Sequence, residues 1–530
     1  MINGEKTMDE MKEKVRAQYG VNKIITGGDY DESLAVKCIN GTFVGKRKEN
    51  IFMYKGIPYV GKQPVGDLRW KAPVDCVADD GVYEAYYYAK CSYGNEDLED
   101  GSLYFPGEDC LYLNVWKADE SVDEKKPVMV WIHGGAYEAG GTADLEFDMV
   151  NFLKENPDVI VVTVAYRLGV FGFLHLSHLP DGKDFPDSQN LGLLDQMMAL
   201  KWVHENIACF GGDPDNVTIW GESAGAGSVT LLPLIEGSQN YFNRVIAQSG
   251  SPSLTRSSED SIECTNDLIE AIGCKSVEEL NKLDSKSLFE ASAIIRLRSG
   301  PERDGIHLPL NPHEAYEKGV AKDIDFLQGC NKDEMNFFRH GFGEEYFKIW
   351  IDDRKARGLA KLPDEDKQLI KSFCNDVEGD GIERYVRIYD QIWFNAPVIR
   401  MSENQTKAGG RSYTYYFIAE TSVPGLKSGH AVELPALFNH PELTEDDGKP
   451  FDETFSRTMR KMWVQFAKTG NPSLTADISP DGKAKEWPLY DLENKKVMVL
   501  DESDIHPEKE SERNIVDWQR TYFLTKYYWL

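Results

Sequence analysis

Residues 210–225 constrain the fold of this chain more than any other stretch, because they join a turn, a short apolar strand and a serine between glycines. The apolar segment 217–220 reads Val-Thr-Ile-Trp, and the segment 221–225 that follows reads Gly-Glu-Ser-Ala-Gly. The latter fits the pattern G-x-S-x-G, in which small residues allow a sharp strand-to-helix turn that lifts the serine hydroxyl above a sheet edge. A serine between glycines also occurs in simple turns. The strand before it and the small residues after it favour a nucleophile at Ser223.

Several other segments are apolar runs of the kind that is buried in a parallel sheet. A helical apolar pattern over 193–207 leads from one of them to the strand before Ser223, and residues 257–295 have the pattern of inserted helices. The sequence therefore predicts an α/β fold with a large, mostly parallel sheet flanked by helices. The expected strands occupy 127–132, 158–164, 217–220, 244–250, 324–329 and 413–417.

A glycine-containing loop follows the strand at 127–132. It reads His133-Gly134-Gly135-Ala136-Tyr137. Acyl transfer builds negative charge on the carbonyl oxygen, and backbone N–H groups preset around that oxygen accelerate the reaction by about 10²–10³ per donor. Glycines let the backbone approach the reacting atoms closely. This loop is therefore a candidate oxyanion hole.

Together these motifs resemble those of the type-B carboxylesterases, an α/β-hydrolase family that includes bacterial para-nitrobenzyl esterases, animal carboxylesterases and cholinesterases. The segments 51–59, 66–73 and 108–116 are similar to further signatures of that family, and the resemblance runs from about residue 36 to near the C-terminus. It implies an α/β-hydrolase fold with helical insertions over the active site. It also implies that the oxyanion donors are the N–H groups of Gly135, Ala136 and Ala224. Para-nitrobenzyl esterases share the alanine at 136, where many relatives have glycine.

The same resemblance implies a catalytic acid and base. The acid falls on Glu334 after the strand at 324–329, with the neighbouring Asp333 as an alternative, and Met335 follows where relatives usually have glycine. The base is His430, in a segment similar to the family's catalytic-histidine loop. Ser223, Glu334 and His430 then occur in the order Ser, acid, His that is typical of α/β-hydrolases.

Glu222, Ser249 and Glu433 resemble buried residues that flank the site in this family. We expect them to support the triad as a network in which one glutamate is protonated, because two neighbouring buried carboxylates cannot both ionise cheaply. Two separate solvated carboxylates are the alternative. His430 and Glu433 also form an H-x-x-E pattern, but no further His or Cys cluster completes a metal site, and we expect no cofactor.

The function that follows is a serine carboxylesterase, a carboxylic ester hydrolase that works through an acyl-enzyme intermediate on a small-molecule ester. An amide or carbamate hydrolase with the same triad is an alternative. So is a non-catalytic binding protein of the cholinesterase-like type, although all three triad residue types are present here. A cholinesterase is disfavoured, because the span 96–106 has no tryptophan for stacking on choline, although Tyr104 and Phe105 could stack on a cation.

Charge and composition exclude several partners. The chain has 59 Lys and Arg residues against 88 Asp and Glu residues, a formal net charge of −29, and such a surface repels nucleic acid and anionic membranes. No signal peptide and no apolar run of about 18 residues is visible, so we expect a cytoplasmic protein. We expect a monomer or a small homo-oligomer. We expect residues 1–35 to form a helical extension with a capping box at 7–10, and residues 36–530 to form a single carboxylesterase domain.

The nine cysteines show no C-x-x-C pairing. Cys264 and Cys274 fall in one helical pattern, about 15 Å apart if that helix is continuous, which is too far for a disulfide. Cys91 and Cys110 resemble a disulfide pair of secreted relatives. A cytosolic location favours reduced thiols at these positions instead.

Overall fold

The structure is a computed structural model that describes residues 13–94, 105–119, 125–295, 297–360, 381–443 and 448–510, with positions 364, 367, 368 and 371. The chain divides into two compact units. The first comprises Met1–Asn243 and Thr255–Leu310, and the second comprises Arg244–Leu254 and Asn311–Leu530. Each unit is therefore assembled from two separate stretches of sequence. The prediction of one domain over 36–530 stays a prediction.

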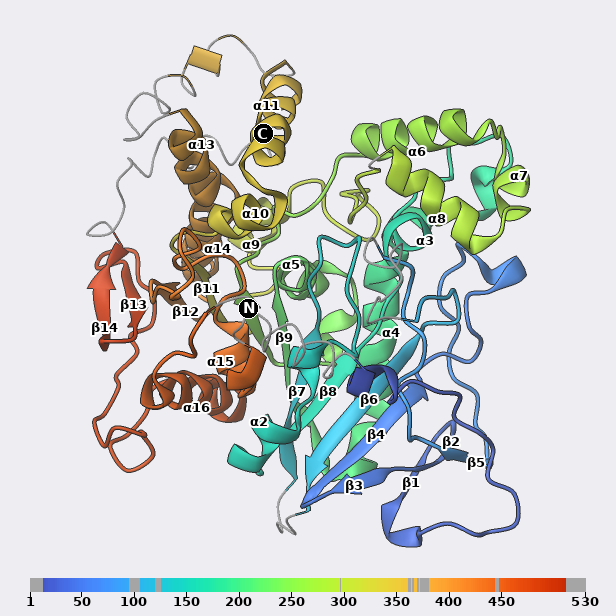
Figure 1. Cartoon of the computed structure of the whole chain (residues 1–530), viewed down its shortest axis with the longest axis horizontal. Helices are drawn as coiled ribbons and strands as arrows, with labels where there is room; N and C mark the ends of the chain where they lie inside the picture. Colours follow the sequence, from blue (N-terminus) through green and yellow to red (C-terminus); the bar gives the residue numbers. More distant parts are fainter. Residues whose placement is uncertain are drawn as a thin grey trace. The chain divides into compact units, whose positions relative to one another are not determined.

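The first unit contains a sheet whose strands follow the order β3-β4-β6-β8-β7-β9 (Figure 1). The neighbours of β7 are both parallel to it, whereas β3, β4 and β6 pair antiparallel at the edge. A smaller sheet has the order β1-β2-β5. The strands of this unit are β1 Ala35–Cys38, β2 Gly41–Val44, β3 Lys46–Lys48, β4 Ile51–Pro58, β5 Val82–Glu84, β6 Tyr112–Ala118, β7 Lys126–Ile132, β8 Ile160–Val164 and β9 Gly212–Glu222.

The central strands of the first unit are buried on both faces. Every residue of β8 is buried, and β7 is buried at all positions except Pro127, as expected for parallel strands covered by helices. Trp131 and Trp220 are directly opposite each other on β7 and β9, with ring centroids 4.9 Å apart. The same register places Ile132 opposite Gly221. The loops that follow these two strands therefore leave the sheet at the same edge.

The helices of the first unit precede and follow these strands. Helix α4 covers most of the predicted pattern at 193–207 and leads into β9, and α5 follows β9 directly. The helices α6 to α8 confirm the predicted helical insertion, and buried leucines and aromatic rings attach them to the segment after α3. The helices are α2 Val150–Glu155, α3 Gly169–Gly172, α4 Leu191–Asn206, α5 Ala224–Leu231, α6 Ser258–Ile272, α7 Val277–Asn281 and α8 Ser285–Ile294.

The second unit contains strands in the order β10-β11-β12-β13-β14, parallel except for the last pair. Strand β11 ends two residues later than predicted, because it continues to Asn331, which pairs with Phe417 at the end of β12. The segments after β11 and β12 therefore also leave their sheet at one edge. The strands are β10 Arg244–Gln248, β11 Asp325–Asn331, β12 Ser412–Phe417, β13 Lys496–Asp501 and β14 Asp504–Lys509.

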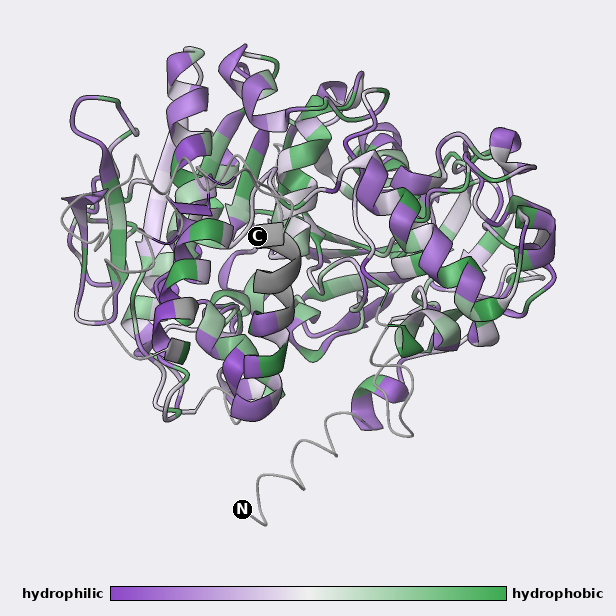
Figure 2. Cartoon of the chain, turned by 90° about the horizontal axis from the view of Figure 1, so that it is seen from above, coloured by the Kyte–Doolittle hydropathy of each residue, from purple (hydrophilic) through white to green (hydrophobic). Residues whose placement is uncertain are grey.

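Helix α16 of the second unit buries one face. In α16 the buried Phe455, Met459, Met462 and Phe466 recur at the three- and four-residue spacing of a helix face. Figure 2 shows the corresponding change between hydrophobic and hydrophilic residues along the helices. The helices are α9 Pro312–Glu317, α10 Met335–Phe342, α11 Glu344–Ala360, α13 Gly381–Tyr389, the π-helix Asp390–Asn395, α14 Ala396–Lys407, α15 Leu434–Phe438 and α16 Glu453–Thr469.

The N-terminal extension is bound to the first unit from its described beginning. The predicted capping box at 7–10 lies outside the described residues, while residues 13–16 are helical. Tyr19 forms a β-bridge with Tyr88, and Ile24 forms one with Tyr83. Nowhere in the described part of the chain is a helix both long enough and apolar enough to cross a membrane.

Candidate active site

Ser223 lies at the sharp turn between β9 and α5, with φ 55° and ψ −121°. A residue other than glycine at such a positive φ costs on the order of 1–3 kcal/mol, and strained positions of this kind cluster at functional sites. The helix begins at the next residue, and the N–H of Gly227 donates to the carbonyl of Ser223 at 2.9 Å. The predicted turn is therefore formed, with the serine at its tip and the first N–H groups of α5 beside it.

The glycines on either side of this turn are required by close packing. A Cβ at Gly221 would lie 2.5 Å from the carbonyl carbon of Gly225, and a Cβ at Gly225 would lie 2.1 Å from the carbonyl oxygen of Ile132. Both distances are far below a van der Waals contact. The two glycines of the motif thus allow α5 to pack directly against the end of β7.

The predicted oxyanion loop lies against the same turn. A Cβ at Gly134 would lie 3.1 Å from the Cβ of Ser223, so this glycine is in contact with the serine. The next residues, Gly135, Ala136 and Tyr137, have φ values of 101°, 57° and 63°. Three successive positive φ values turn the backbone sharply. Two of the three predicted oxyanion donors, Gly135 and Ala136, therefore belong to one loop that packs beside Ser223, and the third, Ala224, begins α5.

His133 fixes the beginning of this loop. Its Nδ1 lies 2.8 Å from the carbonyl oxygen of Gly134, so this nitrogen carries the hydrogen. The ring stacks on Tyr166 with centroids 4.5 Å apart, and the Tyr166 hydroxyl donates to the His133 carbonyl at 2.8 Å. Burial lowers the pKa of His133 to about 4, and the contact with the Gly134 carbonyl only partly opposes this shift. The ring is therefore neutral at physiological pH.

In the second unit the structure pairs His430 with Glu334. The Nδ1 of His430 lies 2.5 Å from Oε2 of Glu334, and the N–H of His430 donates to the Glu334 carbonyl at 3.2 Å. The other carboxylate oxygen, Oε1, accepts the N–H of Asn331 at 2.7 Å. Both side chains are buried. Asp333, the alternative acid, instead accepts a hydrogen bond from the Ser428 hydroxyl at 2.9 Å.

Glu433 is held by two amide side chains that the sequence analysis did not single out. Its Oε1 accepts a hydrogen bond from Gln248 at 2.8 Å, and its Oε2 accepts one from Asn331 at 2.7 Å. Asn331 thus contacts Glu334 through its backbone and Glu433 through its side chain. A polar residue at the end of the strand before the acid was the available signal for Asn331.

The other two residues of the expected supporting network are also buried. Ser249 follows β10 with φ 53°, and its N–H donates to the Gly329 carbonyl at 2.8 Å. Glu222 ends β9 in the first unit and is 5% exposed. Both glutamates are therefore buried, whereas the alternative reading required solvated carboxylates. The network as a whole, and the protonation of either glutamate, remain predictions.

Aromatic side chains that the sequence analysis missed surround the His430 ring. The rings of Phe337, Phe338 and Phe394 have centroids 5.9, 5.3 and 5.1 Å from it. Phe337 and Phe338 lie on α10, and Phe337 is 42% exposed. This wall is apolar, so it can hold the imidazole in place and offer an apolar surface beside it. Only the tertiary fold gathers these rings, because Phe394 comes from a π-helix more than fifty residues later.

The residue directly after Glu334 is bound to a buried carboxyl group through its backbone. Met335 begins α10, and its N–H donates to Oδ1 of Asp390 at 2.8 Å. Burial raises the pKa of Asp390 well above its ordinary value, and the Met335 hydrogen bond only partly offsets this rise. The carboxyl group of Asp390 therefore accepts a hydrogen bond from the backbone N–H of the residue that follows Glu334.

Three remaining predictions concern aromatic stacking on a cation, the cysteine pair and metal binding. Phe105 packs on Tyr19, with centroids 4.7 Å apart, and Tyr104 lies outside the described residues. Cys91 and Cys110 are both buried and both thiols. Among the described residues no group of three or more His, Cys, Asp or Glu side chains is arranged to hold a metal ion.

Comparison with known proteins assigns this chain to a family. The model of the carboxylesterase family matches residues 32–516. The para-nitrobenzyl esterase of Bacillus subtilis (strain 168) is 34% identical over 493 residues, which cover 89% of this chain and 96% of that protein. The cholinesterase of Mus musculus is 29% identical over 506 residues, 84% of this chain and 79% of that protein.

Solved structures agree with the sequence comparison. A carboxylesterase of Geobacillus stearothermophilus has a TM-score of 0.77 at 34% identity and covers 94% of this chain and 100% of its own. A thermophilic PNB esterase has a TM-score of 0.77 at 31% identity, and the match covers 92% of this chain and 99% of that protein. The predicted α/β-hydrolase fold with a large, mostly parallel sheet is thereby confirmed, as is ester hydrolysis as the type of reaction. This chain belongs to the carboxylesterase family and is a carboxylic ester hydrolase.

Proposed function

We propose that this chain hydrolyses small-molecule carboxylic esters through an acyl-enzyme intermediate on Ser223, with His430 as general base and acid and Glu334 as the carboxylate that orients the imidazole. The observation that carries the proposal is the 2.5 Å contact between His430 Nδ1 and Glu334. A hydrogen on Nδ1 leaves Nε2 as the basic nitrogen, which is the tautomer that a serine nucleophile requires. The strained backbone of Ser223 supports the choice of nucleophile.

The reaction then proceeds in two acyl-transfer steps. Ser223 Oγ attacks the ester carbonyl, His430 takes the hydroxyl proton, and the same proton passes to the departing alcohol. The N–H groups of Gly135, Ala136 and Ala224 hold the oxyanion. Water attacks the acyl-enzyme in the second step, with His430 again as the base, and releases the acid and Ser223. Buried Glu334 stabilises the imidazolium in both steps.

The first test is the steady-state hydrolysis of para-nitrophenyl esters by the full chain. Ser223→Ala is expected to lower kcat by roughly 10⁶, as when a triad nucleophile is removed. An organophosphate should label the intact protein at Ser223 and leave the variant unlabelled there. Retained turnover in folded Ser223→Ala, or an intact protein that is not labelled at Ser223, would show that the nucleophile is another residue.

The two adjacent carboxylates after β11 provide a matched pair for the acid. Glu334→Gln keeps the size of the side chain but removes its charge, and we expect kcat to fall by up to about 10⁴, because the imidazole loses its correct tautomer. Asp333→Asn changes the neighbouring residue, which contacts Ser428, and kcat is expected to change by less than about tenfold. The reverse order of effects would assign the acid to Asp333.

The alternative of amide or carbamate hydrolysis uses the same residues and is separated by substrate. Matched ester and anilide substrates with the same acyl group should differ in kcat/KM, with the ester preferred. Equal or faster anilide turnover would favour the amide hydrolase. The cytoplasmic location and the monomeric or small oligomeric state remain predictions from the sequence.

The loop Gly134-Gly135-Ala136 carries a narrower proposal about the alcohol part of the substrate. Relatives with this type of loop can accept esters of bulky tertiary alcohols, and Gly134 leaves no side chain in contact with Ser223. We expect measurable hydrolysis of tert-butyl acetate. Preparations that turn over para-nitrophenyl acetate but release no tert-butanol would remove this proposal and leave the esterase assignment intact.

A further inference from the structure

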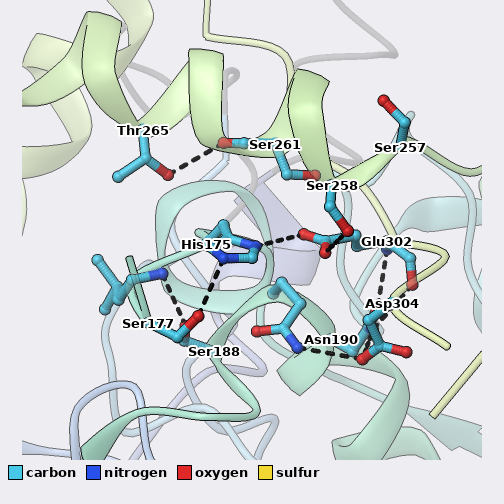
Figure 3. Close-up of polar contacts among 12 residues, drawn as sticks. His175, Ser177, Ser188, Asn190, Ser257, Ser258, Ser261, Thr265, Glu302 and Asp304 are labelled. Carbon is cyan, nitrogen blue, oxygen red and sulfur yellow. Dashed lines mark hydrogen bonds and ion pairs between the residues drawn. The ribbon is translucent and has the colours of Figure 1, made fainter. Parts of the chain in front are cut away.

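A second serine, histidine and glutamate are aligned in the first unit, and none of the three belongs to the proposed triad. Figure 3 shows the ring of His175 between the carboxylate of Glu302 and the hydroxyl of Ser177. The Nδ1 of His175 lies 2.7 Å from Oε2 of Glu302, and its Nε2 lies 2.9 Å from Oγ of Ser177. A nucleophile, a base and an orienting acid in hydrogen-bond reach of one another are the signature of an activated nucleophile.

The serine and the histidine lie in a short segment whose leucines are buried. Residues 174–177 follow α3 and read Leu-His-Leu-Ser, and both leucines are buried in the core that also holds α6 and α8. The N–H of Leu179 donates to the carbonyl of Leu176 at 3.0 Å and closes a turn that contains Ser177. The buried leucines hold this segment against the core, while Ser177 is exposed and reaches Nε2 of His175.

Glu302 is held rigidly behind the histidine. Its side chain is fully buried, and Oε1 accepts a hydrogen bond from the Ser258 hydroxyl at 2.6 Å. Its backbone exchanges two hydrogen bonds with the side chain of Asn190, at 2.8 and 2.9 Å, and Asn190 also donates to Asp304 at 3.0 Å. The carboxylate therefore has one oxygen committed to Ser258 and the other directed at His175.

These contacts determine the tautomer of His175. An ionised Glu302 can only accept, so the hydrogen of the neutral ring lies on Nδ1. The Nε2 lone pair then faces the hydroxyl of Ser177. Ser177 is exposed, whereas His175 is 12% exposed and Glu302 is buried. If the cluster served only to attach this segment to α6, the contacts from His175 to Glu302 and from Glu302 to Ser258 would be enough. A solvent-accessible hydroxyl beside the other ring nitrogen would then not be needed.

We propose that Ser177 is an accessory nucleophile that accepts acyl groups from activated esters and phosphoryl groups from organophosphates. The Ser177 O–H bond breaks as Oγ bonds to the carbonyl carbon or to phosphorus, and His175 Nε2 takes the proton. The bond to the leaving aryl oxide breaks with its electron pair, and His175 later releases the proton to solvent. The proposal rests on contacts within the first unit and is independent of the roles assigned to Ser223, Glu334 and His430.

The expected product is a covalent adduct that forms once and is slow to turn over. The N–H of Leu179, two residues after the serine, already donates to the Leu176 carbonyl at 3.0 Å and cannot serve a developing oxyanion. Each missing oxyanion donor costs about 10²–10³ in rate. Labelling of Ser177 is therefore a better readout than steady-state hydrolysis.

The experiment uses the full chain with Ser223→Ala, so that the proposed main nucleophile does not consume the probe. The protein is incubated with diethyl para-nitrophenyl phosphate or para-nitrophenyl acetate, digested with trypsin and analysed by mass spectrometry over time. Cleavage after Arg167 and Lys183 releases residues 168–183, in which Ser177 is the sole serine. Residues 24–37 form an internal control, because their one serine, Ser33, is exposed and donates to Asp31 rather than to a histidine.

We expect the 168–183 peptide to be labelled at least about 10² times faster than the 24–37 peptide, the contribution of a positioned general base. Ser177→Ala should abolish the adduct, which would exclude His175 or His178 as the labelled residue. His175→Gln should lower the labelling rate to that of Ser33, and Glu302→Gln should lower it as well. Thermal unfolding would verify that each variant is folded.

Two results would overturn the proposal. One is that the 168–183 peptide of the folded Ser223→Ala protein is labelled no faster than the 24–37 peptide that contains Ser33. This comparison can be made with His175 unchanged. The other is fast labelling that His175→Gln and Glu302→Gln leave unchanged, because the serine would then not be activated by its neighbours. In either case the cluster would have a structural role alone.

Discussion

Several residues of the candidate site are held in conformations that their neighbours impose. Ser223, Ala136 and Ser249 have positive φ values although none is glycine. Such strain persists only where surrounding packing over-determines the backbone. At Ser223 the packing comes from the glycine contacts between α5 and β7, and at Ala136 it comes from a loop whose beginning is fixed by His133.

Acid stability should depend on His133. Burial lowers its pKa from 6.5 to about 4. Because the pKa in the folded state is below that in the unfolded state, the contribution to stability is fully present above about pH 6.5 and is lost as the pH falls toward 4. About pH 5 is roughly 1.5 pH units below the unfolded-state pKa of 6.5. At about 1.4 kcal/mol per unit, the free energy of unfolding is therefore lower by about 2 kcal/mol. Wild type should therefore show a clear drop in Tm between about pH 7.5 and pH 5.

His133→Asn removes the titrating ring but keeps a donor for the Gly134 carbonyl. We expect it to have a lower Tm at about pH 7.5 and a smaller further drop at about pH 5. His178→Asn is the matched control, because His178 is exposed and contacts Asn266, and its pH-dependent drop should equal that of wild type. An equal drop in His133→Asn and wild type would refute the assignment.

At the scale of elements, pairs of strand ends position the candidate site. The ends of β7 and β9 are in register in the first unit, so the oxyanion loop and Ser223 leave the sheet together. The ends of β11 and β12 are in register in the second unit, and Glu334 and His430 follow them. In open α/β sheets ligands bind beyond the carboxyl ends of parallel strands, for this geometric reason.

The packing of α5 on β7 predicts contrasting effects of two Gly→Ala substitutions. A Cβ at Gly225 would lie 2.1 Å from the Ile132 carbonyl oxygen, whereas a Cβ at Gly341 in α10 would meet nothing within 4 Å. Gly225→Ala should cost more than about 3 kcal/mol, because backbone on both sides must move, and should lower both Tm and esterase activity. Gly341→Ala should be neutral or stabilise by about 0.5–1 kcal/mol, the gain of alanine over glycine in a helix. Similar Tm values for the two variants would show that α5 is not packed as described.

At the scale of the whole molecule, the N-terminal extension is part of the first unit rather than an appendage. The side chain of Asn22 donates to the carbonyls of Lys55 and Tyr87 and accepts the N–H groups of Tyr86 and Tyr87. Lys55, which is buried, donates to Gln18 at 2.6 Å, and burial lowers the pKa of this lysine to about 8. The extension therefore satisfies backbone groups that would otherwise lack partners.

Asn22→Ala should destabilise the folded chain by about 1–3 kcal/mol, because it leaves partly buried backbone groups without hydrogen bonds. Asn494→Ala is the control, since its side chain is exposed and contacts only Asp491 nearby, and it should change stability by less than about 0.5 kcal/mol. Thermal unfolding measures both. A Tm for Asn22→Ala equal to that of wild type would mean that the extension contributes nothing to the stability of the first unit.

Much of the candidate site could be predicted because its signals are local. The strand-turn-helix around Ser223, the glycine loop at 134–136 and the segments of Glu334 and His430 each lie within a few residues, where alternation, glycine and motif spacing act directly. The positions of the six expected strands along the chain and the helical insertion were also predicted correctly, since buried runs and helical periodicity are read over short windows.

The tertiary structure alone decided which distant residues meet. His430 contacts Glu334 rather than Asp333 across 96 positions, Glu433 binds Gln248 across 185, and Glu302 reaches His175 across 127. Asp333 and Glu334 are adjacent carboxylates, and local sequence pattern does not distinguish them. The path of the backbone after β11 decides which of the two reaches His430. Long-range partners depend on strand order and loop paths, which no short segment encodes. For that reason the supporting amides and the Ser177–His175–Glu302 cluster became visible only in the folded chain.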